Sequence, residues 1–317
     1  MRTSFLFFAL VLPLPIFATA NGETPLKVFV LAGQSNMVGA GQVNANPDHN
    51  GGAGSLEQLV KSPETAEEFR HLVDEDGAWR VRDDVYVNYF ERDGGLTVGY
   101  GSNGDTIGPE LGFGTVVGDH FDEPVLLIKV AWGGKSLAQD FRPPSRGDAP
   151  GPYYTQLFDQ VRAVLGDLEA HVPGYAGQGY ELAGFGWHQG WNDRVNQAFN
   201  DEYEENLAAF IRDLRAELEV EDLPFVIAET GMHGPEETHP RALSLMRAQA
   251  AVAEREEFAD DVAFVPTRAL YRPPEQSPSR QGYHWNGNAE TYYRIGAAMG
   301  EAMLQLVAED ESPTEGD

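Results

Sequence analysis

The chain has 317 residues, of which 42% are hydrophobic and 11% aromatic, so a large core can form and wholesale disorder is excluded. With 22 basic and 50 acidic side chains its formal net charge is -28, and a surface this negative repels the phosphate backbone of nucleic acids. Cysteine is absent, which excludes disulfides, thiol nucleophiles and thiolate metal sites.

Residues 1–20 predict a secretory signal. Arg2 precedes an apolar run over residues 5–17, and small residues at 18–20 form a cleavage pattern. A buried helix is a poor alternative because Pro13 and Pro15 would break it. The run is also too short for a permanent bilayer anchor. We therefore expect a secreted protein, extracellular or periplasmic, without a stable membrane anchor.

After the signal, segments typical of buried strands alternate with segments typical of helices. Pro109 opens one helix with Glu110 in its first turn, and residues 207–218 place five apolar side chains on one face of another. This alternation predicts an α/β fold, a three-layer, doubly wound and mostly parallel sheet with helices on both faces. The strand-like segments are 26–32, 124–131, 181–188, 224–229 and 262–267. The other helical segments are 239–256 and 288–307.

Residues 40–108 do not follow this alternation. They are rich in Gly, Asn and Asp, and only residues 85–90 (VYVNYF) suggest an extra strand. We expect an irregular insertion over the carboxyl edge of the sheet rather than a separate domain. One domain is then predicted over residues 21–308, followed by a frayed acidic tail at 309–317.

The segment Gly33-Gln34-Ser35-Asn36-Met37 directly follows the first predicted strand. Ligands of open α/β sheets bind at the carboxyl ends of the strands, so Ser35 is placed where a substrate arrives. If a helix begins after Ser35, its free amides can also hold a developing oxyanion. Ser35 could equally be an ordinary helix N-cap, and both interpretations stay open at this point.

Three further polar segments follow predicted strands or precede the last helix. Gly133-Gly134 lets backbone amides approach a ligand closely, although an ordinary turn explains it as well. Residues 187–193 (WHQGWND) combine an imidazole, two carboxamides, a carboxylate and two indoles. Indoles provide stacking faces for sugar rings, and an amide from Gln189 or Asn192 could donate to an oxyanion. His284, late in the chain, is suited to act as base for Ser35.

Together these segments resemble the ordered blocks of SGNH (GDSL-like) hydrolases, and more closely the branch of sialate O-acetylesterases and carbohydrate esterase family six acetylesterases. The blocks are GQSNM at residues 33–37, AWGGKS at 131–136, GWND at 190–193 and HWNGNAETYYRIG at 284–296. GPELGFG at 108–114 supports the match. The resemblance covers most of the chain except the 40–108 insertion, and it implies the flavodoxin-like fold of these hydrolases.

The resemblance implies a serine esterase that removes acetyl groups from carbohydrate without a metal or organic cofactor. Ser35 would be the nucleophile and His284 its general base, because a serine hydroxyl is weak until an imidazole takes its proton. The oxyanion hole would combine the Ser35 amide, an amide of Gly133 or Gly134, and a side chain of Asn192 or Gln189. The side chains expected to bind substrate are Gln34, Trp187, His188, Trp191 and Trp285.

The chain departs from the family pattern at both usual positions of the catalytic acid. Gln281 stands three residues before the histidine, and Trp191 stands where relatives often have glutamate. We expect either a Ser-His dyad or another carboxylate beside His284. Asp193 is the first choice for that carboxylate because it lies at the same strand end, and Glu229 and Glu110 are poorer choices. A backbone carbonyl could also orient the imidazole.

Two other functions compete with the esterase. The missing acids would suit a carbohydrate-binding protein that kept the fold and lost catalysis. A metal-dependent hydrolase built on His188, His233, His239 and His284 is a weaker alternative, because the histidines have no metal-binding spacing.

Overall fold

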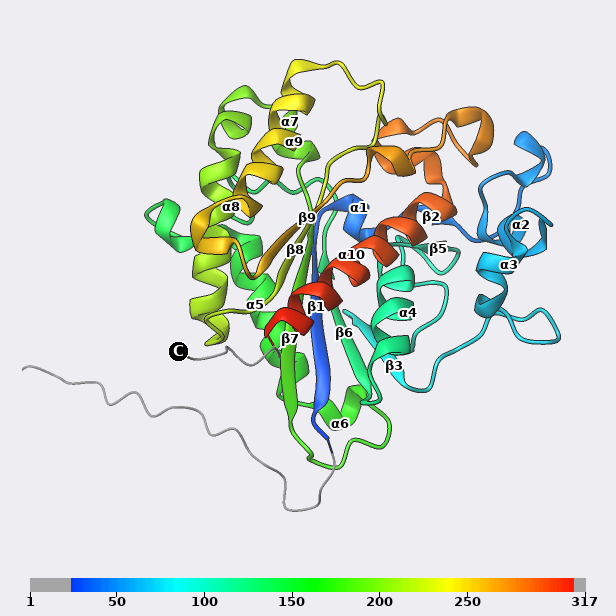
Figure 1. Cartoon of the computed structure of the whole chain (residues 1–317), viewed down its shortest axis with the longest axis horizontal. Helices are drawn as coiled ribbons and strands as arrows, with labels where there is room; N and C mark the ends of the chain where they lie inside the picture. Colours follow the sequence, from blue (N-terminus) through cyan, green and yellow to red (C-terminus); the bar gives the residue numbers. More distant parts are fainter. Residues whose placement is uncertain (1–23, 311–317) are drawn as a thin grey trace, which may run out of the picture.

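The computed structural model describes residues 24–310 (Figure 1). Its strands are β1 (Leu26–Gly33), β2 (Gly41–Gln42), β3 (Val85–Tyr89), β4 (Arg92–Gly95), β5 (Thr106–Ile107), β6 (Val125–Ala131), β7 (Tyr180–His188), β8 (Phe225–Ala228) and β9 (Val262–Val265). Seven of them form one sheet in the order β4-β3-β6-β1-β7-β8-β9, while β2 and β5 pair separately. All neighbours in the large sheet run parallel except β3 and β4.

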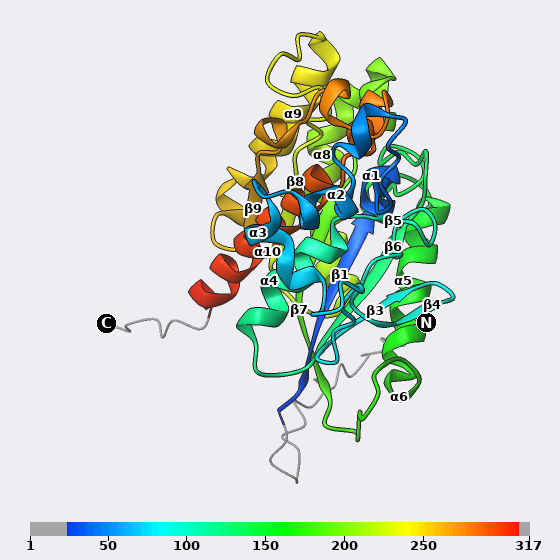
Figure 2. The same cartoon turned by 90° about the vertical axis from the view of Figure 1, so that its right-hand side faces the viewer.

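Helices cover both faces of the sheet, and the predicted three-layer α/β fold is confirmed. In Figure 2, α4 and α10 lie on one side of β1 and α5 lies on the other. Among the helices of residues 24–310, none is long and apolar enough to cross a bilayer. The helices are α1 (Ser35–Val38), α2 (Leu56–Lys61), α3 (Ala66–Phe69), α4 (Glu110–His120), α5 (Pro152–Leu165), α6 (Leu168–His171), α7 (Trp191–Arg194), α8 (Gln197–Leu218), α9 (Pro240–Ala253) and α10 (Ala289–Asp310).

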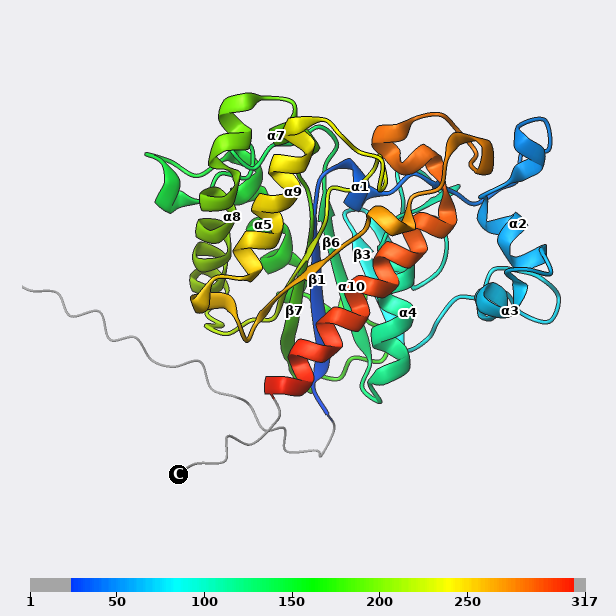
Figure 3. The same cartoon turned by 45° about the horizontal axis from the view of Figure 1, so that its top comes forward.

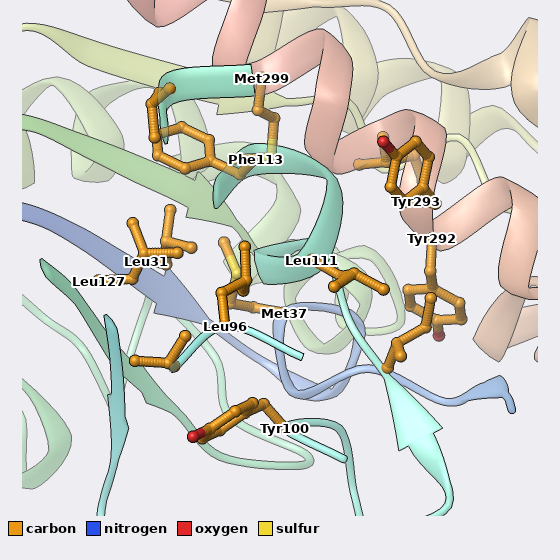
Figure 4. Close-up of a cluster of buried hydrophobic side chains, with 14 of the residues drawn as sticks. Leu31, Met37, Leu96, Tyr100, Leu111, Phe113, Leu127, Tyr292, Tyr293 and Met299 are labelled. Carbon is orange, nitrogen blue, oxygen red and sulfur yellow. The ribbon is translucent and has the colours of Figure 1, made fainter. Parts of the chain in front are cut away.

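Alternation along the central strand builds two apolar layers. Phe29 and Leu31 of β1 pack into the layer beneath α4 and α10, whereas Val28 and Val30 belong to the layer beneath α5, α8 and α9. Figure 4 shows the first layer, in which Leu31 lies near side chains of α4 and α10. Successive side chains of a strand point to opposite faces, so a strand buried on both faces is apolar throughout. This explains why the sequence of β1 shows no polar alternation.

Helices α4 and α10 approach each other closely because both carry glycine at the contact. A Cβ atom on Gly112 would lie 2.0 Å from the carbonyl oxygen of Tyr293, and one on Gly296 would lie 1.9 Å from that of Pro109. Any larger residue at either position would push the helices apart. The resemblance block that begins at Gly108 and the block that ends at Gly296 are thus packed against each other.

The segment 40–108 is more integrated than an irregular insertion. Its strands β3 and β4 extend the main sheet, because all five residues of β3 are buried and four of them, Val85 to Asn88, pair with β6. Helices α2 and α3 and the β2–β5 pair account for much of the rest. The expected signal lies outside the described residues, as does residue 311 onward of the expected tail. Helix α10 continues to Asp310, two residues into that tail.

Candidate active site

Three neighbouring strands end at the same edge of the sheet, and each continues into one of the predicted segments. β1 leads to Ser35, β6 leads to Gly133 and Gly134, and β7 leads to Gln189 and α7. Figure 3 shows α1 at this end of β1, close to the orange segment that precedes α10. The parallel sheet therefore gathers residues from distant parts of the sequence, as ligand sites in open α/β folds require.

Ser35 is the first residue of α1 and is partly exposed. Gln34 occupies the N-cap position, so the alternative that Ser35 is merely an N-cap is wrong. The turn needs glycine before it, since Gly33 has a φ of +154° and a Cβ there would lie 2.2 Å from the carbonyl oxygen of His188. Asn36 and Met37 are buried and anchor the turn below the serine.

The side-chain amide of Asn36 links the serine segment to the histidine segment. It donates to the carbonyl oxygen of Tyr283 over 3.1 Å, and its own oxygen accepts from the Tyr292 hydroxyl at 2.7 Å. Asn36 follows Ser35 directly and Tyr283 precedes His284 directly. The two segments are 247 positions apart in the chain, and this hydrogen bond holds them side by side. Sequence reasoning did not single out Asn36.

His284 lies in a distorted 3-10 segment, Gly282–Gly287, whose next two residues, Trp285 and Asn286, have positive φ angles of 50° and 56°. Such backbone is strained for these residues and is held by its surroundings. Asn286 supplies part of that support by donating to the carbonyl oxygen of Arg272 at 3.0 Å. Burial lowers the pKa of His284, which keeps its imidazole neutral and able to accept a proton.

No carboxylate is bonded to the His284 ring among the contacts of residues 24–310, and the three candidates have other partners. Asp193 accepts hydrogen bonds from the amides of Leu137 and Ala138 at 2.8 and 2.9 Å and from Gln189 at 2.6 Å. The other two have partners elsewhere. Glu229 bonds the Thr267 amide and pairs with Arg268, and Glu110 pairs with Lys129. The expectation that Asp193 orients His284 therefore has no contact to support it.

Asp193 instead fastens the segment that follows Gly134 to helix α7. Its carboxyl group is completely buried, and burial raises its pKa to about 6 although the three N–H donors oppose the shift. All three donors need an acceptor, so the ionised carboxylate satisfies the arrangement best. The position of the two glycines relative to α7 thus depends on this buried charge.

Gln34 and Gln189 extend the same buried network and are not free to meet a substrate. The Gln34 side-chain oxygen accepts from the amides of Gly190 and Asn192 at 3.1 and 3.3 Å, and from Gln189 at 3.3 Å. The Gln189 amide also donates to the Lys135 carbonyl at 3.0 Å and to Asp193. With its N–H groups engaged, Gln189 is a poor oxyanion donor, and this expectation is corrected.

Asn192 and the two glycines border the open space next to the serine segment. The Asn192 amide donates to the Gly134 carbonyl at 2.7 Å, which leaves its second N–H for another acceptor. Gly133 and Gly134 are exposed, and a Cβ at Gly133 would meet nothing within 4 Å. Gly134 has a φ of +70°, which favours glycine at this turn. Gly133, Gly134 and Asn192 are therefore the accessible members of the expected oxyanion donors.

Four of the five side chains expected to bind substrate are buried, and those expectations are wrong as direct contacts. Gln34 is 2% exposed, Trp187 and Trp285 are 0% exposed and His188 is 1% exposed. Only Trp191 is partly exposed. Trp187 and His188 are the last residues of β7, where the sequence pattern is typical of a ligand site. In the structure this strand stays buried on both faces up to its last residue, so both side chains are enclosed.

His188 is buried without a partner for either ring nitrogen among the described residues. Burial alone lowers its pKa to about 3, so the ring is neutral at any ordinary pH. Trp187, its neighbour, packs against Phe210 and Phe141 with ring centroids 4.7 and 5.2 Å away. Both residues belong to the supporting core.

A buried ion pair fixes the other end of α1. The Lys129 ammonium of β6 donates to the carbonyl oxygens of Val38 and Tyr100 at 2.8 and 2.7 Å and to Glu110 at 2.5 Å. Glu110 in turn accepts from the Gly108 amide at 2.8 Å. Both charged side chains are completely buried, and all three ammonium protons have acceptors. The pair joins β6, α4 and the last residue of α1.

Within residues 24–310, no group of three or more His, Asp or Glu side chains could hold a metal ion. His188 is buried and unpartnered, whereas His233 packs against the Trp191 ring at 5.8 Å and His239 caps α9. The described residues therefore do not bring the four histidines considered for a metal site into one cluster with acidic side chains.

A model of the family described as "Carbohydrate esterase, sialic acid-specific acetylesterase" matches residues 25–305 of this chain. The chain belongs to this family. It is a hydrolase of the carbohydrate acetylesterase family, and the resemblance seen in its motifs is confirmed. A comparison with curated proteins found no match.

Two solved structures share the fold of this family member. A protein of Arabidopsis thaliana has a TM-score of 0.57 and 16% identical residues, and the match covers 88% of this chain and 98% of that one. A carbohydrate acetylesterase from Xanthomonas citri has a TM-score of 0.54 and 15% identical residues, with 89% and 56% covered. The chain thus spans little more than half of the Xanthomonas enzyme. At such identities the likeness concerns the fold alone.

Proposed function

We propose that this protein is a secreted serine esterase that removes O-acetyl groups from carbohydrate through an acetyl-enzyme on Ser35. The observation that carries the proposal is the Asn36–Tyr283 hydrogen bond, which brings the serine and histidine segments together. Family membership supports the acetyl ester as the substrate class. The signal-like residues 1–20 support secretion.

The first half of the reaction acylates the enzyme. The Ser35 hydroxyl oxygen attacks the acetyl carbonyl carbon while the neutral His284 imidazole accepts the hydroxyl proton. The Ser35 amide, an amide of Gly133 or Gly134 and the free N–H of Asn192 donate to the resulting oxyanion. The intermediate collapses when the C–O bond to the sugar breaks, and the imidazolium returns its proton to the sugar oxygen.

Water completes the cycle by the same route. His284 removes a proton from a water molecule that attacks the acetyl-enzyme, and collapse of the second intermediate releases acetate and restores the Ser35 hydroxyl. Each oxyanion-hole donor is generally worth about 3 kcal/mol of barrier. We propose that Ser35 and His284 act as a dyad, since the described contacts offer His284 no carboxylate.

The decisive experiment is acetate release by wild type and Ser35→Ala, with p-nitrophenyl acetate as a small substrate. Wild type should turn over and form a Ser35 adduct 42 Da heavier, the mass of the added acetyl group, whereas Ser35→Ala should do neither and keep its thermal stability. Thr155→Ala, on the surface of α5, serves as a matched control. Undiminished hydrolysis by Ser35→Ala would refute the proposal.

A carbohydrate-binding protein without catalysis remains the second candidate, because His284 lacks a carboxylate partner among the described contacts. That function predicts retention on a polysaccharide column together with no acetate release from any acetyl ester. Acetylated xylan, O-acetyl sialic acid and acetylated marine polysaccharides form the screening panel. Acetate release from any of them decides for the esterase.

A further inference from the structure

An open groove of about 590 Å³ lies between helix α5 and the β3–β4 hairpin, outside the site described above. Figure 2 shows α5 beside that hairpin. The volume is within the usual range for small-molecule sites. The residues that line it are Phe90, Glu91, Trp132, Gln156, Asp159 and Gln160.

The groove adjoins the serine segment through Trp132. The Trp132 amide donates to the carbonyl oxygen of Gly33 at 3.3 Å, two residues before Ser35. Trp132 also directly precedes Gly133, which faces open space. One residue of the groove wall is thus bonded to the end of the strand that leads to Ser35.

Two aromatic rings form one wall of the groove. Phe90 and Trp132 lie 5.3 Å apart between ring centroids and are both partly exposed. Tyr153, 4.9 Å from Trp132, holds the indole from another side. Rings fixed in this way lose little conformational entropy when a ligand packs on them.

Phe90 keeps its ring in the groove despite an unfavourable backbone. Its φ is +55°, in the left-handed region that bulky residues avoid. Glycine would satisfy the turn between β3 and β4 without strain. A bulky residue kept at a strained position suggests a role for its ring, which packs against the core on one side and lines the groove on the other.

The opposite wall is polar and negative. Glu91, Gln156 and Asp159 are exposed, and no contact within residues 24–310 engages their side chains. Gln160 is fixed by donating to Asn88 at 3.1 Å. Carboxylates and carboxamides hydrogen-bond sugar hydroxyls, and none of the described residues that line the groove is a cation that would attract an acidic sugar.

We propose that this groove is a subsite for a neutral pyranose unit of the carbohydrate whose acetyl group is cleaved at Ser35. The apolar C–H face of the sugar packs on Phe90 and Trp132, and its hydroxyls bond Gln156 and Asp159. This inference rests on the proposed function for the position of the ester. It adds a preference for neutral oligomers over acetylated monosaccharides.

The test compares Phe90→Gly and Asp159→Ala with Thr155→Ala, an exposed α5 residue that does not line the groove. Phe90→Gly removes the ring at a position where the positive φ suits glycine. Because the ring also packs against the core, thermal unfolding of the variant verifies that the fold is kept. Substrates are p-nitrophenyl acetate, which carries no sugar unit, and partly acetylated hexaoses of xylose, mannose and glucose.

Both groove variants should keep wild-type kcat/KM on p-nitrophenyl acetate and lose roughly tenfold on at least one hexaose, a change of about 1.4 kcal/mol. Thr155→Ala should leave kcat/KM unchanged on both p-nitrophenyl acetate and the hexaoses. Equal losses on both substrate types, no loss on any hexaose, or the same loss in Thr155→Ala would overturn the proposal.

Binding separates this proposal from the esterase function. Calorimetry on Ser35→Ala with unacetylated hexaoses and with trigalacturonate requires no turnover. We expect a neutral hexaose to bind and the Phe90→Gly/Ser35→Ala variant to bind it at least fivefold more weakly. The proposed subsite is refuted if no neutral hexaose binds, or if trigalacturonate binds as tightly as the neutral hexaoses. Absence of acetate release from any ester refutes the esterase instead.

Discussion

Asn36 donates its side-chain amide to the carbonyl oxygen of Tyr283, so the residue after the proposed nucleophile is bonded to the residue before the proposed base. Asn36 is 1% exposed, and its side-chain oxygen is occupied by the Tyr292 hydroxyl. A buried amide with both ends engaged has little freedom to shift. The relative position of the serine and histidine segments therefore depends on a residue other than the proposed nucleophile and base.

Asn36→Leu should reduce kcat on p-nitrophenyl acetate by about 10- to 100-fold with a small change in KM. The variant removes the acceptor of the buried Tyr292 hydroxyl, at about 1–3 kcal/mol, and breaks the bond to the more exposed Tyr283 carbonyl, so the histidine segment is less firmly held. Steady-state kinetics measures the split between kcat and KM. Tyr292→Phe, which removes one hydroxyl and keeps the Tyr283 bond, should retain most of kcat. Equal losses in both variants would assign Asn36 to stability alone.

Replacing one partner of the Lys129–Glu110 ion pair should lower the free energy of unfolding more than replacing both partners. Lys129→Met leaves a buried carboxylate without its counter-charge, and we expect a loss of about 3–5 kcal/mol in the free energy of unfolding. Urea unfolding of Lys129→Met and of Lys129→Met/Glu110→Leu measures this.

The double variant should regain much of the stability but not the full kcat. The Val38 carbonyl at the end of α1 lacks its ammonium donor in both variants, so the serine turn is less firmly held. A double variant with wild-type kcat would show that the pair only stabilises the fold.

The pH profile should reveal that His284 works without a carboxylate. Burial lowers its pKa, so the acidic limb of kcat/KM is expected below pH 6.5, the ordinary histidine value. Gln281→Asp places a carboxylate three residues before the histidine. A nearby negative charge stabilises the imidazolium, so the limb should move to higher pH in this variant. Gln281→Asn is the control and should leave the limb in place; an unmoved limb in Gln281→Asp contradicts the assignment.

His188 should make the fold sensitive to acid. Its pKa is about 3 in the folded chain and near 6.5 when unfolded, so the unfolded state gains the proton first as pH falls. Stability is then complete above pH 6.5 and is lost progressively towards pH 3, by as much as about 5 kcal/mol.

His188→Leu should remove most of this dependence, whereas His120→Gln, at an exposed histidine, should not. Urea unfolding at pH 7, 5.5 and 4 gives the comparison. Asp193 has a raised pKa and the opposite trend, but it is present in all three proteins. Parallel curves for wild type and His188→Leu would show that His188 titrates normally.

Much of the architecture could be predicted because local pattern and burial agree. The buried strands β1, β6, β7, β8 and β9 and the amphipathic α8 follow from apolar runs and helical periodicity. Helix α5 was not predicted, although its Pro152 after Gly151 is a recognisable start signal. Strands β3 and β4 were expected at most as an extra strand, because their place in the main sheet depends on pairing with β6.

The sequence by itself determined which functional groups are available: a serine after the first strand, two glycines after another strand, and a late histidine without an acid at the usual position. Only the tertiary structure decided how these side chains are used. Burial assigned Gln34, Gln189 and Asp193 to a supporting hydrogen-bond network, placed Trp285 in the hydrophobic core and left Trp191 partly exposed. The physical reason is that exposure and hydrogen-bond partners depend on contacts between residues far apart in the chain, such as Asn36 with Tyr283 and Lys129 with Val38.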